Sequence, residues 1–65
     1  MKNWDRKTGK NVTPPKRVTT FLEDLEKLCR IHNVSISHED THGSFELEEF
    51  DEHNIQWINR ANLNL

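Results

Sequence analysis

A lone cysteine, Cys29, most limits how this chain can fold. Without a second thiol, no intrachain disulfide can cross-link the 65 residues. A chain of this size buries only about 60% of the surface that its unfolded form exposes, while conformational entropy opposes folding by about 1–2 kcal/mol per residue. Since only 32% of the residues are hydrophobic, we expect one small domain. Self-association would add apolar burial, so the sequence leaves open whether the chain forms a homodimer.

No stretch of the sequence has the character of a membrane or secretory segment. The apolar runs fall well short of the roughly 20 residues that span a bilayer. The first ten residues lack the apolar region of a signal peptide. An unpaired cysteine is typical of a reducing compartment. We therefore expect a cytoplasmic protein with no membrane partner.

Apolar spacing predicts two helices. Thr20 and Glu23 have the spacing of a capping box, and apolar residues follow them at helical intervals for three turns. Asn33 is suited to end this helix in a left-handed conformation. Asp51 is a good N-cap for the second helix, whose buried stripe begins with Ile55.

Between these helices, apolar and polar residues alternate as they do in a β-hairpin. Phe45 and Leu47 are expected to face inward and Glu46 and Glu48 outward, because side chains alternate along a strand. An isolated two-stranded hairpin is marginal in water, so its apolar face must rest on helices. The sequence predicts an α+β fold of order αββα, with the hairpin packed on two helices.

The first part of the chain differs from the rest in charge and pattern. Residues 1–16 show neither helical nor strand periodicity, so we expect a flexible basic tail before a single domain at residues 17–65. Six basic residues against one acidic residue lie in 1–17, and seven acidic residues against one basic residue lie in 38–65. This asymmetry concerns partners and not the fold.

Acidic side chains gather in the predicted turn, in the second strand and at the start of the second helix. Such a surface can imitate a nucleic-acid backbone or dock onto a basic patch of a partner, with gains in association rate and specificity. Ordinary solvated charge is the alternative. The predicted partner-binding residues are Glu39, Asp40, Glu46, Glu48, Glu49, Asp51 and Glu52.

The basic segment supports a second hypothesis, binding of nucleic acid. Lysines and arginines attract phosphates, and a tryptophan can stack on a base. The net acidic remainder of the chain argues against a dedicated nucleic-acid binder. The residues of this alternative site are Lys2, Trp4, Arg6, Lys7, Lys10, Lys16 and Arg17.

One cysteine and three histidines have a spacing that suggests a zinc site. Zinc binds thiolate and imidazole ligands in tetrahedral sites, and the residues concerned are Cys29, His32, His38 and His42. However, Cys29 lies in an apolar stripe, where a thiol behaves as a small hydrophobic group. We favour structural roles for all four and expect neither a metal nor a cofactor.

The segment from His38 to His42 also places imidazoles beside carboxylates, as in acid–base catalysis. No nucleophile or oxyanion-binding pair accompanies them, and a chain of this size leaves little room for a cleft. We therefore expect a protein that is not an enzyme.

Four segments carry a resemblance to a known group of proteins. With Leu28–Arg30, Val34–Phe45, Phe50–Glu52 and Asn54–Trp57, the chain resembles small uncharacterised proteins carried by bacteriophages and prophages of Gram-positive bacteria. The resemblance covers residues 20–60 and leaves out the basic segment. It implies a phage-encoded accessory protein in a bacterial host cell. We expect such a protein to bind a protein partner, as a regulator or inhibitor, through its hairpin and acidic surface.

Overall fold

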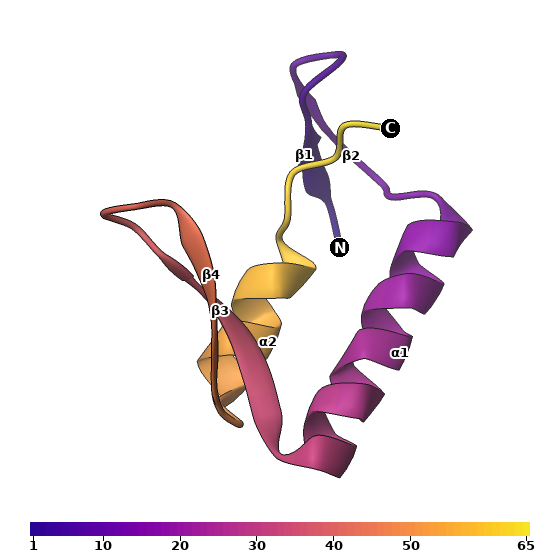
Figure 1. Ribbon diagram of the computed structural model, residues 1–65. Coiled ribbons are helices and arrows are strands. Elements are labelled where there is room, and N and C mark those ends of the chain that lie inside the picture. The colour runs from indigo at the N-terminus through magenta and orange to yellow at the C-terminus, as the bar shows by residue number, and fades with distance from the viewer.

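The computed structural model describes residues 1–65 and has the element order ββαββα (Figure 1). The elements are β1 (Asn3–Asp5), β2 (Lys10–Val12), α1 (Lys16–His32), β3 (Val34–Glu39), β4 (Ser44–Glu49) and α2 (Glu52–Asn59). The strands form two separate antiparallel hairpins. The fold is therefore a small mixed α+β fold, and the expected αββα order is not confirmed. Neither helix is long and apolar enough to cross a membrane.

The N-terminal segment, expected to be a flexible tail, forms the β1–β2 hairpin. Trp4 pairs with Asn11 across the two strands. The Asp5 carboxylate accepts a hydrogen bond from the Lys7 amide at 3.1 Å, and Gly9 closes the turn with a positive φ of 68°. Strands of three residues are too short to show alternation, which is why the sequence pattern did not predict them.

Long-range contacts hold this hairpin on the C-terminal segment, and the two run side by side in Figure 1. Asn3 is 2% exposed, and its Nδ2 donates to the carbonyls of Asn59 and Ala61, each at 2.9 Å. Leu63 is also buried, and its amide donates to the Trp4 carbonyl at 2.8 Å. The N-terminal segment thus packs on residues almost sixty positions away in the chain.

Helix α1 begins one turn earlier than the capping-box spacing indicates. Pro15 is the N-cap residue, and its carbonyl accepts two amides of the first turn. Thr20 and Glu23 lie inside the helix and form no capping box, so that prediction is wrong. A proline is well placed here because its fixed φ suits a helix start. The predicted end is confirmed, since Asn33 has a φ of 56°.

The β3–β4 hairpin presents a different face to α2 from the one we expected. The predicted hairpin is confirmed, but Ser35 is fully buried, while Phe45 is 76% and Leu47 75% exposed. The prediction that Phe45 and Leu47 face inward is therefore wrong. A serine side chain is small enough for the backbone at the start of α2 to approach closely.

Ser35 forms a polar node with the N-terminal turn of α2. Its Oγ donates to the Glu49 carbonyl at 3.0 Å and accepts from the Asp51 amide at 3.2 Å and from Asn54 Nδ2 at 3.0 Å. Asn54 Nδ2 also donates to Glu48 Oε2 at 2.9 Å. The hydroxyl uses its one donor and both acceptor positions, so its burial carries no unpaired group.

The apolar core is small. Leu22 and Cys29 of α1, Ile55 of α2 and Leu63 of the C-terminal segment are the buried hydrophobic residues. Four side chains leave little apolar burial to offset chain entropy. The polar node and the contacts of Asn3 are therefore a large part of what fixes the elements relative to one another.

We expect Asn3→Ala to destabilise the fold by about 1–3 kcal/mol, because two part-buried carbonyls lose their donor. Asn11→Ala is the matched control, since Asn11 is exposed on the same hairpin. Urea denaturation of both variants measures the difference. Equal transition midpoints would show that the two Asn3 hydrogen bonds do not stabilise the fold.

We expect Asn54→Ala to cost a similar amount, about 1–3 kcal/mol, since Ser35 and Glu48 each lose a partner. Gln56→Ala, at an exposed position of the same helix, is the control and should change stability by less than about 0.5 kcal/mol. Thermal unfolding followed by circular dichroism compares the two. A loss of equal size in both variants would contradict a special role for the Asn54 side chain, because alanine raises helix propensity at both positions.

Candidate functional site

Strand β4 is the most open element of the structure. All six of its residues are exposed, and its backbone approaches no element other than β3. Its outer edge has no neighbouring strand, because the sheet ends there. Such an edge presents unpaired amides and carbonyls to any strand that comes alongside.

Three aromatic rings extend from β4 across β3 to α2, and we call them the aromatic row. His38 lies directly opposite Phe45 in the hairpin, with ring centroids 5.7 Å apart. The His38 ring is also 6.4 Å from that of Trp57, and both contacts are edge-on. Phe45 and Trp57 remain at least half exposed. Aromatic side chains such as Trp and Phe are enriched in the cores of protein interfaces.

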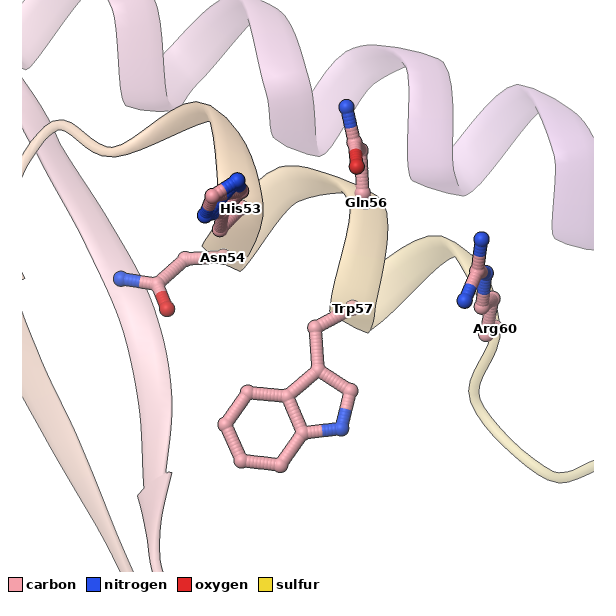
Figure 2. A pocket seen from close by; sticks show the side chains of 5 residues that line it. All are labelled: His53, Asn54, Gln56, Trp57 and Arg60. Carbon is pink, nitrogen blue, oxygen red and sulfur yellow. The ribbon is translucent and has the colours of Figure 1, made fainter.

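The aromatic row ends beside an open hollow on α2 (Figure 2). Its lining residues are His53, Asn54, Gln56, Trp57 and Arg60. Trp57 and Gln56 project from opposite sides of the helix, and Trp57 is the one apolar side chain of the lining. Arg60 and the indole N–H are both donors. The hollow therefore combines one aromatic ring with four polar side chains.

The acidic residues predicted to bind a partner are mostly engaged within the chain. One of the seven, Glu46, makes no side-chain hydrogen bond, and six have partners. These pairs are Glu39 with the amides of Thr41 and His42, Asp40 with His38, Glu48 with Asn54, Glu49 with Asn33, Asp51 with the His53 amide, and Glu52 with Arg30. The charges remain near the surface, but most also serve the fold.

Glu39 organises the turn between β3 and β4. Its two carboxylate oxygens accept the amides of Thr41 at 2.7 Å and of His42 at 2.8 Å. The backbone amide of His42 is the main reason that the pKa of Glu39 lies below its usual range, and the amide of Thr41 adds to it. Gly43 completes the turn with a φ of 69°.

The basic residues of the alternative site cluster at the opposite end of the chain. Five of the seven residues lie in or beside the β1–β2 hairpin, and Lys16 and Arg17 are in the first turn of α1. None of the six bases forms an ion pair. Trp4 is about half exposed on β1. The hairpin thus presents free positive charge beside an accessible indole.

The four residues with zinc-like spacing do not come together. Cys29 is buried on α1, whereas the His38 ring lies against Asp40 and the His42 ring against Glu39. No three metal-ligating side chains are close enough to share an ion. The two histidines of the turn have carboxylate partners within hydrogen-bond reach.

The sequence did not predict that Phe45, His38 and Trp57 belong to one surface. Phe45 was expected on the covered face of the hairpin, where it could not join an exposed surface with His38 and Trp57. The small Ser35 and Ser37 in the middle of β3 were the available signal. Serines allow a helix backbone to approach the sheet on their own face, which leaves the apolar face free.

No protein-family model, no curated protein and no solved structure matches this chain. What the chain does must therefore be inferred from its own residues.

The lowered pKa of Glu39 gives the hairpin a defined response to acid. A carboxyl whose folded-state pKa lies below its unfolded value stabilises the fold above the unfolded pKa, and this contribution is lost as the pH falls through the folded pKa. Carbon-detected NMR titration should place the Glu39 pKa lower in the native protein than in urea. In Glu39→Gln this part of the acid dependence of unfolding should disappear. Identical pKa values in the two states would contradict the assignment.

Proposed function

We propose that this chain is a small non-catalytic protein-binding module that acts through the β3–β4 hairpin and its acidic surface. One observation carries the proposal: β4 is exposed along its whole length, with Phe45 and Leu47 on one face and Glu46 and Glu48 on the other. Large apolar side chains left in water beside an unpaired strand edge are features of a binding surface.

The pattern of β4 defines the partner that fits it. An extended segment that adds to the free edge would place alternate side chains on the two faces of the sheet. Apolar side chains would then meet Phe45 and Leu47, and basic side chains would meet Glu46 and Glu48. The aromatic row would take the apolar anchor of such a segment. The expected ligand is an extended peptide in which apolar and basic residues alternate.

The resemblance to phage proteins gives this proposal a cellular setting. A phage-encoded accessory protein acts inside the host cell, so the first partners to test are cytoplasmic proteins of a Gram-positive bacterium. If this chain occupied a strand-binding or basic surface of such a host protein, it would inhibit or redirect that protein.

A second candidate function is association with nucleic acid through the β1–β2 hairpin. The observation that favours it is the set of six unpaired basic residues around the half-exposed Trp4. Phosphate contacts make affinity depend steeply on salt, with a slope of about −0.9 per contact on duplex DNA. Peptide binding at a mixed apolar and acidic strand depends on salt much less.

Peptide binding can be measured by the fluorescence of Trp57 in a Trp4→Phe background, where no other tryptophan contributes. We expect alternating apolar and basic peptides to bind, and Phe45→Ser to weaken them at least about tenfold, as loss of an aromatic anchor does. Glu46→Lys should also weaken them, because Glu46 is the one of the seven predicted partner-binding residues without an internal partner.

The matched control is Glu23→Lys, which makes the same charge change at an exposed position of α1. It should leave peptide affinity unchanged. If Phe45→Ser and Glu46→Lys bind as tightly as the parent, the β4 surface is not the site. If instead Lys7→Glu and Lys10→Glu abolish binding of duplex DNA with a steep salt slope, the second candidate takes its place.

A further inference from the structure

The folded chain is less compact than its length allows. Its Cα radius of gyration is 12.6 Å, and its dimensions are 34 × 29 × 16 Å. A compact domain of this length has a radius of gyration of about 11 Å. The elements are therefore spread out, and Figure 1 places α1 and the β3–β4 hairpin on opposite sides, with α2 between them.

The exposed surface area also exceeds that of a compact monomer, and the excess indicates the size of the surface that a partner would cover. The chain exposes 5154 Å². A folded monomer of 7.7 kDa exposes about 4300 Å². The excess, about 800 Å², equals the share that one partner contributes to an interface of standard size.

Much of the uncovered apolar surface lies on α1. Phe21, Leu28 and Ile31 are 62%, 53% and 74% exposed. Their spacings of seven and three residues place them on one side of the helix. We call these three residues the outer stripe. Leu22 and Cys29, which are buried, lie on the adjoining side, so the chain covers only part of the apolar arc of α1.

We propose that the outer stripe is the interface of a homodimer, with α1 of one copy antiparallel to α1 of the other. A twofold interface must be complementary to itself. The stripe runs from residue 21 to residue 31, so its midpoint lies near residue 26. A twofold axis beside it, between residues 25 and 26, sets Asp24 of each copy opposite Lys27 of the second copy. Both are exposed and unpaired within the chain.

Strand β4 is a poor alternative for self-association. In an antiparallel pair of two β4 strands, side chains of the same face stand opposite one another. Glu46 and Glu48 share a face, so acidic residues would be opposed across the dimer. Pairing through α1 avoids this repulsion and leaves both copies of the aromatic row free. The dimer is thus independent of the proposed peptide binding and would present that site twice.

Sedimentation equilibrium of the full chain, from micromolar to submillimolar concentration, tests the dimer. We expect a mass of twice 7.7 kDa at the upper end, and at least a tenfold rise in the dissociation constant for Ile31→Glu. Phe45→Glu is the matched control, because Phe45 is equally exposed but lies on β4. It should dimerise normally. A monomer at every concentration, or a dimer lost only in Phe45→Glu, would overturn the proposal.

Charge exchange tests the antiparallel arrangement. Asp24→Lys and Lys27→Asp should each weaken the dimer, and the double variant Asp24→Lys/Lys27→Asp should restore it. If Ile31→Glu fails to fold, the thermal midpoint of the unaltered protein decides, since that of a dimer rises with concentration. A midpoint independent of concentration would refute self-association, and a double variant weaker than either single one would refute the pairing.

Discussion

The hydroxyl of Ser35 is the point on which the arrangement of the second half of the chain depends. Because it bonds to the end of β4, to the amide of the N-cap residue and to Asn54 at once, it fixes where α2 starts relative to the sheet. A larger side chain at this position would push the helix away. With α2 held by a polar contact on one strand, the apolar residues of the hairpin are left uncovered. The exposed site therefore follows from a buried serine.

Local features of the sequence were sufficient to predict the helices and strands of residues 16–59, but they did not predict the β1–β2 hairpin. Helical spacing, the left-handed Asn33 and the Asp51 cap are decided within a few residues, so they could be predicted, although Pro15 and not Thr20 begins α1. The β1–β2 hairpin is stabilised instead by Asn3 and by the C-terminal segment. A contact between two ends of a chain leaves no periodic pattern, and a polar anchor such as Asn3 gives no hydrophobic signal.

The candidate site, too, could be predicted only in part. Charge could be read from the sequence, and the acidic hairpin and the basic N-terminal segment are where composition placed them. Whether a carboxylate is free could not be predicted, because its partner is set by the turn or helix that forms around it, as with Glu39 and Glu48. Alternation alone also does not determine which face of a hairpin is covered. Both faces of β4 satisfy the strand pattern, and only the position of α2 selects one.

The parallel bridge between Asp5 and Leu63 has a consequence for the order of folding. It closes a loop of nearly the whole chain, so its entropic cost is met only after α1, the β3–β4 hairpin and α2 have brought the ends together. We therefore expect the N-terminal hairpin to dock last and to be the first part to detach in a native-state fluctuation. Its amide hydrogens should exchange with solvent through this local opening, whereas we expect the amide hydrogens around Ser35 to exchange only through global unfolding. The positively charged end of the molecule is thus the part with the most freedom to move as a unit.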